Sequence, residues 1–152
     1  MLEDKDVWNI LDLEYKRYPQ DFGKSNDEEK IKQAEESLAL TFTSSYKKFL
    51  NKYGSATLPG HIIYGLTPLP EMGTTINNVI DKTNFYKQTQ KWPGIDNWYI
   101  ISDDGRGNPI GIDPEGKVWL SDHDADFEQV NLAENFEKFL YKLLTDTLYE
   151  LN

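Results

Sequence analysis

Residues 103–113, DDGRGNPIGID, are the first stretch whose residue types could perform chemistry, because glycines there stand among acidic and polar residues. A glycine-rich loop binds phosphate when it opens a helix and is followed by a Lys-Ser or Lys-Thr pair. Pro109 stands where that helix would begin, and no such pair follows it. We therefore expect a turn between two strands, in which glycine permits a positive φ angle.

A second acidic stretch is spaced like the start of a calcium-binding loop. Its acids alternate at Asp122, Asp124, Asp126 and Glu128. An EF-hand loop beginning at Asp122 would need glycine at its sixth position and glutamate at its twelfth. Those positions hold Phe127 and Ala133. We expect an exposed acidic loop here, with no metal site and no other cofactor.

Nucleophilic catalysis needs a base beside the nucleophile, and the histidines of the chain are His61 and His123. His61 opens an apolar strand, where a hydrogen-bonded core histidine is usual. His123 lies among aspartates, which favour its charged form. No nucleophile-elbow or zinc-protease motif occurs. The sequence therefore predicts a non-enzyme, although its 26 acids leave a hydrolase with a carboxylate pair as an alternative.

The charge of the chain bears on its partners. A net charge of −10 and a pI near 4.6 argue against direct nucleic-acid binding, which needs clustered lysine or arginine. Residues 101–137 hold ten acids and two basic residues, so they contribute −8 of that total. This charge is either a solvated surface or a patch that attracts a basic protein.

Cellular location follows from features that the sequence lacks. The chain has no cysteine, which excludes disulfides and thiolate metal sites. No run approaches the roughly 20 apolar residues that span a bilayer. The first 12 residues carry four acids and no basic region before an apolar core, unlike a secretory signal. We expect a cytoplasmic protein that does not insert into membranes.

An aromatic residue near the acids is a candidate anchor for a partner. Trp119 alternates with Val118 and Leu120, so it faces the opposite side of its strand. It is either covered by another segment or an exposed contact ringed by acids, as in interface hot spots. The candidate partner-binding residues are Asp103, Asp104, Arg106, Asn108, Trp119, Asp122, His123, Asp124, Asp126 and Glu128.

Helices and short strands must position these residues. Apolar spacing predicts helices over 4–18, from Ser25 as a capping residue, from Ser44 to a stop at Gly54, and from about Thr74 to before Pro93. A buried strand is expected at 61–66. Three more are expected in NWYIIS, PIGID and KVWLS, with a type I turn at DPEG.

A final helix should follow Asn131 as its capping residue. Residues 1–152 should form a single domain, with no linker or internal repeat between its elements. Helices, then an antiparallel β-meander, then a closing C-terminal helix predict an α+β fold in which the helices pack on the sheet.

The order of these elements resembles the SUKH superfamily, which includes cell-wall-assembly regulators of the SMI/KNR type and bacterial immunity proteins. The likeness lies in IKQAEESLALTF with SYKKFLNKYGSA, in HIIYGLTP, in WYIISDDGRGNPIGIDPEGKVWLSDHD, and in LAENFEKFLYKLL. These stretches span about residues 27–144. Family members often have proline before the third helix, where this chain has Thr43-Ser44, a cap that serves the same purpose.

The resemblance implies a function without a shared catalytic triad. An immunity protein would bind and inhibit a cognate, basic protein toxin domain, frequently a nuclease or other nucleic-acid-modifying enzyme. The alternative, from the other branch of the family, is a regulatory scaffold of cell-wall or glucan synthesis. The sequence leaves the toxin's identity and the oligomeric state open.

Overall fold

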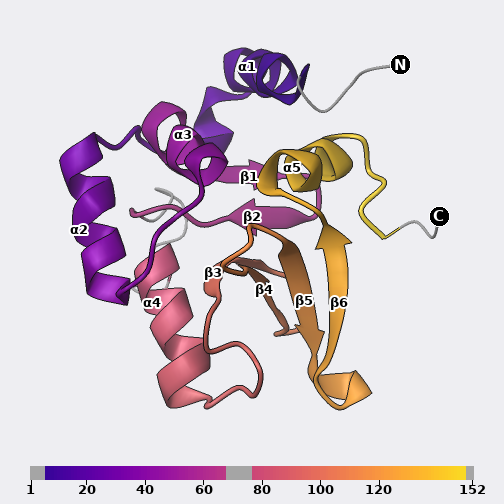
Figure 1. Ribbon diagram of the computed structural model, residues 1–152. Coiled ribbons are helices and arrows are strands. Elements are labelled where there is room, and N and C mark those ends of the chain that lie inside the picture. Colours follow the sequence, from indigo (N-terminus) through magenta and orange to yellow (C-terminus); the bar gives the residue numbers. More distant parts are fainter. Residues whose placement is uncertain (1–5, 68–76, 150–152) are drawn as a thin grey trace.

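The computed structural model describes residues 6–67 and 77–149 and has an α+β fold, as the sequence predicts (Figure 1). Its α-helices are α1 (Val7–Arg17), α2 (Glu28–Leu38), α3 (Ser44–Lys52), α4 (Val79–Asn84) and α5 (Phe136–Leu144). Its strands are β1 (Ala56–Leu58), β2 (His61–Ile63), β3 (Tyr99–Asp103), β4 (Pro109–Ile112), β5 (Val118–Asp122) and β6 (Glu128–Ala133). Shorter helical turns are η2 (Pro19–Asp21), η3 (Phe85–Thr89) and η4 (His123–Ala125). No helix in these ranges has both the length and the apolar composition needed to cross a membrane.

The main sheet is the predicted antiparallel meander with one strand more, in the order β3-β4-β5-β6. The sequence pattern did not predict β6, because EQVNLA is largely polar at its exposed start. It also missed β1, which has only three residues and pairs with β2 in a separate hairpin. The hairpin meets the main sheet where the N–H of Tyr64 donates to the carbonyl of Ile101, at 2.8 Å.

One face of the meander packs on helices and forms the main core. Ile110 and Ile112 of β4 are fully buried there, together with Tyr46 and Phe49 of α3. The ring of Phe136 meets those of Tyr46 and Phe49 at centroid distances of 5.3 and 5.6 Å, edge to face. Burying such a side chain stabilises the fold by about 1.5–3 kcal/mol. This contact joins α3 to α5, so the last helix closes the core as expected.

The opposite face of the meander carries a second, smaller cluster. Its buried members are Tyr86, Ile95, Trp98 and Ile100, with Phe85, Trp92 and Trp119 packed against them. Residues 85–98 therefore cover this face instead of leaving it to solvent. Gly111 makes the covering possible, because a Cβ there would lie 2.8 Å from Cε3 of Trp98.

Three helix starts differ from the predictions. The predicted capping residues are Ser25, Ser44 and Asn131. The side chains that accept the third backbone N–H of each helix belong to Asp27, Thr43 and Asn135. Asn131 cannot cap a helix because it lies in β6, where it pairs with Trp119. Each error is small along the chain, since several capping residue types stand close together before each helix.

Within the described residues, the fourth predicted helix begins at Val79. Asn78 caps α4 by accepting from the N–H of Asp81, and η3 continues the helix as a π-helix. The chain leaves helical geometry at Lys91, whose φ angle is 49°, before Pro93 as predicted. The predicted start near Thr74 lies outside the described residues.

Candidate functional site

Two loops that hold most of the candidate residues meet at one end of the main sheet. Antiparallel pairing places Asp103 opposite Pro109 and Asp122 opposite Glu128, so the β3–β4 turn and the β5–β6 loop share an end. In Figure 1 the β5–β6 loop lies at the far end of the sheet from α1, α3 and α5. We call residues 103–108 and 122–128 together the loop end.

Asp104 builds the first loop. Its carboxylate accepts hydrogen bonds from the N–H of Arg106 at 2.8 Å, the N–H of Asn108 at 3.1 Å and the side-chain amide of Asn108 at 2.8 Å. Burial would raise the pKa of Asp104, but the hydrogen bonds from Asn108 and Arg106 outweigh it, and the pKa lies below its usual value. Gly105 and Gly107 take positive φ angles of 80° and 85°, so this is the strand-to-strand turn that the sequence predicts.

Asn108 joins the first loop to the second. Its side chain is fully buried and donates from Nδ2 to Oδ1 of Asp122 at 3.4 Å, in addition to Asp104. Its Oδ1 accepts from the backbone N–H of His123 at 3.0 Å and from Nδ1 of the same histidine. Arg106 adds an ion pair across the loops, with Nη2 3.5 Å from Oδ2 of Asp122. Hydrogen bonds and an ion pair therefore hold the two loops of the loop end together.

Burial divides the ten candidate residues. Asn108 is fully buried, and the side chain of Asp104 is 6% exposed. Neither side chain is accessible for direct contact with a partner. Both instead hydrogen-bond within the loop end and hold its two loops in place. Asp103 is also engaged, since it accepts from the hydroxyl of Tyr64 at 2.9 Å and pairs with Nζ of Lys82 at 3.4 Å. Burial, and then the nearby Asp103 carboxylate, raise the pKa of Tyr64 far above its usual value.

The remaining acids of the loop end do face solvent. Asp124, Asp126 and Glu128 are exposed, and Asp122 is partly buried beneath them, where it accepts from the N–H of Asp124 at 2.9 Å. His123 is exposed as well, with Nε2 3.3 Å from a carboxylate oxygen of Asp124. The structure thus brings together most of the predicted contact residues.

Trp119 does not lie at the loop end. It sits partly buried in the second aromatic cluster, and its indole N–H donates to Oδ2 of Asp113 at 2.9 Å. Asp113 belongs to the β4–β5 turn at the opposite end of the sheet. Of the two interpretations that the sequence left open for Trp119, coverage by another segment fits this geometry better.

Phe127 is the aromatic residue that sequence reasoning missed. It is 37% exposed between two acids, and its ring packs edge to face on Trp92 at 5.2 Å. Trp92 is held in turn by a hydrogen bond from Nε1 to Oγ of Ser121, at 2.7 Å. The signal in the sequence was a large apolar residue inside an acidic run, where solvation alone would not require one.

The charge surplus of residues 101–137 does not form one patch. The strand register pairs Val118 with Ala133, so the β4–β5 turn and the start of α5 lie at the end opposite to Asp122 and Glu128. The acids on that opposite side are Asp113, Glu115, Glu134 and Glu137. The acids of residues 101–137 therefore do not form a single acidic surface, and the candidate surface for a basic partner is the loop end alone.

One group at the loop end has the composition of a metal site. Within the described ranges, Asp122, His123 and Asp124 are the group whose potential ligand atoms all lie within 4.8 Å of one another. His123 already bonds Asn108 through Nδ1 and contacts Asp124 through Nε2. These contacts account for the arrangement without an ion, and the absence of a metal stays a prediction.

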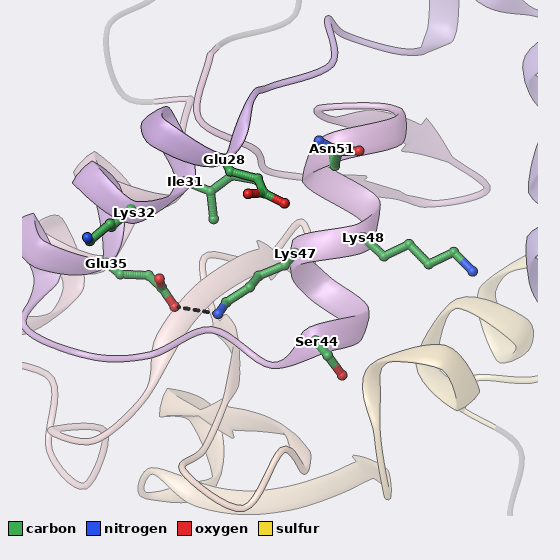
Figure 2. Close-up of a pocket in the computed structure, with 8 residues that line it drawn as sticks. All are labelled: Glu28, Ile31, Lys32, Glu35, Ser44, Lys47, Lys48 and Asn51. Carbon is green, nitrogen blue, oxygen red and sulfur yellow. Dashed lines mark ion pairs between the residues drawn. The ribbon is translucent and has the colours of Figure 1, made fainter.

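A cleft of about 600 Å³ lies between α2 and α3 (Figure 2). Its lining residues are Glu28, Ile31, Lys32, Glu35, Ser44, Lys47, Lys48 and Asn51. Glu35 accepts from the backbone N–H of Phe42 at 2.7 Å and pairs with Lys47 at 3.4 Å, while Lys48 points away to the ring of Trp8. Its central charges therefore join α2 to α3, and nothing in the cleft pairs a nucleophile with a base.

Comparison with known proteins supports the resemblance drawn from the sequence. Residues 10–145 match the family model SUKH_5, described as SMI1-KNR4 cell-wall. The match covers all four stretches that carry the resemblance. No curated protein matches the chain.

Proposed function

The chain belongs to the SUKH superfamily, in its SMI1-KNR4 family, and from this premise we propose that it is an immunity protein that binds and neutralises a cognate toxin without catalysing a reaction. The toxin would be a basic protein domain, a nuclease or another enzyme that acts on nucleic acid. The protein would meet it in the cytoplasm.

The observation that supports this proposal is the set of exposed acids on a rigid support. Asp124, Asp126 and Glu128 are exposed on the β5–β6 loop. Non-covalent contacts of Asn108 and Arg106 hold this loop against the β3–β4 turn. A toxin that holds nucleic acid needs a cationic surface for phosphate, and fixed carboxylates complement such a surface. Complementary charge accelerates association, and a pre-ordered loop loses little conformational freedom on binding.

The test co-expresses the chain in a bacterial host with the C-terminal domain encoded by the neighbouring upstream gene, as the candidate toxin, and measures protection. The test variant is Asp124→Lys, Asp126→Asn and Glu128→Lys, in which asparagine is chosen because residue 126 has a φ angle of 57°. The control variant Glu29→Lys, Glu36→Lys and Glu115→Gln changes the net charge by the same amount at exposed acids elsewhere. Circular dichroism verifies that both variants fold.

We expect the test variant to lose protection and the control variant to keep it. Association of the parent chain with the toxin should slow as salt rises, because screening shortens the reach of the acids. Full protection by the folded test variant would refute the proposed use of the loop end. Equal loss in both variants would show that net charge alone matters.

The scaffold function remains the second candidate because the family description names the cell wall. A scaffold of this kind would bind enzymes of envelope or glucan synthesis rather than a toxin. Affinity purification of the full chain that recovers such enzymes, in cells that the chain fails to protect from any neighbouring toxin, would favour it. Assays on phosphoester and glycoside substrates, with and without divalent metal, test the proposed lack of catalysis.

A further inference from the structure

The two edges of the main sheet differ in how they are protected. At the β3 edge the β1–β2 hairpin lies alongside, where the N–H of Tyr64 donates to the carbonyl of Ile101. At the other edge β6 is the last strand in the sheet order. An uncovered edge strand presents backbone N–H and C=O groups that can pair with a further strand.

Only the first part of β6 is open. Leu132 and Ala133 are buried, and Nζ of Lys142 donates to the carbonyl of Leu132 at 2.8 Å, which blocks that end of the edge. Residues 128–131 are all exposed. The open length is therefore four residues, enough for a short added strand but not for a long one.

The side chains along this open length favour a partner of particular chemistry. Val130 is 41% exposed and Phe127 is 37% exposed, so the edge offers two apolar contacts beside its backbone groups. Asp124, Asp126 and Glu128 surround the same end. Arg106, the basic residue of the loop end, is already paired with Asp104 and Asp122. A strand that carries both basic and apolar side chains would satisfy these groups.

A second copy of this chain is a poorer occupant. In a two-fold antiparallel pairing of β6 with itself, the acidic loop of each copy would lie beside Glu134 of the other. β6 contains no lysine or arginine that would offset this repulsion, and like charges across a strand pair are destabilising. Self-association through the open edge is therefore disfavoured by charge.

We propose that the open edge of β6, residues 128–131, binds an extended, lysine- or arginine-containing segment of a protein partner as an added strand. This inference deepens the proposed function by giving its binding mode, and it rests on the same loop end. Backbone pairing supplies affinity that does not depend on the partner's side chains, whereas Val130 and the acids select apolar and basic ones.

The experiment uses the full chain, labelled with nitrogen-15, and the blocked peptide Lys-Val-Lys-Val-Lys-Val-Lys as a probe. In NMR spectra of the labelled chain, we expect the peptide to change the amide chemical shifts of residues 128–131 and to slow their amide hydrogen exchange. A peptide with glutamate in place of each lysine should not bind. A peptide with proline at its centre should bind about tenfold more weakly, because it loses a backbone hydrogen bond and cannot pair along its length.

Matched variants separate the edge from general charge. Val130→Lys should weaken the lysine peptide about tenfold, because it replaces an apolar contact with a repulsive charge. Leu13→Lys introduces the same charge on α1, where Leu13 is 56% exposed, and should leave the affinity unchanged. Thermal unfolding verifies that both variants keep the fold.

Several results would overturn the inference. They are the absence of shifts in residues 128–131, an undiminished affinity of the proline peptide, or a β6-dependent dimer in light scattering. The immunity proposal fails separately: a chain that binds the peptide at β6 but protects against no neighbouring toxin refutes that function and leaves the edge site standing. If the parent chain binds no peptide at residues 128–131 while Val130→Lys still protects against the toxin, the edge site is refuted and the immunity proposal stands.

Discussion

Asn108→Ala is expected to lower the free energy of unfolding by about 3 kcal/mol. The largest loss is the hydrogen bond from Nδ2 to the Asp104 carboxylate at 2.8 Å, for which about 1.5–3 kcal/mol is typical with a charged partner. The backbone N–H of His123 loses its acceptor at 3.0 Å, which costs about 1 kcal/mol more. The bond to Asp122 is long, at 3.4 Å, and adds little.

Urea denaturation followed by far-ultraviolet circular dichroism measures this change. A loss of about 3 kcal/mol corresponds to a fall in melting temperature of about 6–12 °C for a chain of this size. The matched control is Asn131→Ala, which removes two hydrogen bonds from an exposed side-chain amide to the backbone carbonyls of Val118 and Ala133. It should cost about 1 kcal/mol or less, because water replaces those bonds.

The outcome also bears on binding. If Asn108 holds the two loops together, its loss should speed amide exchange in residues 122–127 and weaken any ligand of the loop end. A change below about 1 kcal/mol, or one equal to that of Asn131→Ala, would refute the role assigned to Asn108.

Three further predictions concern single residues. Folding lowers the pKa of Asp104, so its carboxylate stabilises the fold at pH values above the ordinary aspartate pKa of about 4. This stabilisation is lost as the pH falls through the lower pKa of the folded state. In urea titrations, Asp104→Asn should therefore lower the free energy of unfolding more at neutral pH than at pH about 2. Gly111→Ala should destabilise the fold by about 1–3 kcal/mol in the same assay, because the new Cβ would press on Trp98 at 2.8 Å. Tyr46→Phe should cost about 1–2 kcal/mol, since it leaves the buried carbonyl of Tyr64 without its 2.6 Å donor, whereas replacing the exposed Tyr18 by phenylalanine should change little.

Periodicity in the sequence was sufficient for most of the fold. The apolar spacing of α3 and α5 predicts which side chains they bury, because a helix that packs on one side must repeat its apolar residues every three or four positions. The turns at DDGRGN and DPEG likewise follow from glycine and proline chemistry. The strand β6 escaped prediction because an edge strand buries too few side chains to show a clear alternation.

The candidate site was predictable only in outline. Antiparallel strands bring Asp104 and Asp122 to one end of the sheet, and this much follows from the meander alone. The burial of Asn108 does not, since an asparagine beside two glycines looks like an exposed turn residue until the second loop closes over it. The exposure of Phe127 and the partial covering of Trp119 both depend on where residues 85–98 cross the sheet, which no local pattern encodes.

The tryptophans give the molecule a built-in optical signal. Three of the four indoles, those of Trp92, Trp98 and Trp119, belong to the cluster on the outer face of the sheet. The ring of Trp92 contacts those of both Phe127 and His123, at 5.2 and 5.9 Å. Occupation of the neighbouring loop should alter the surroundings of this indole, so its emission would report a docking event in solution with no attached dye.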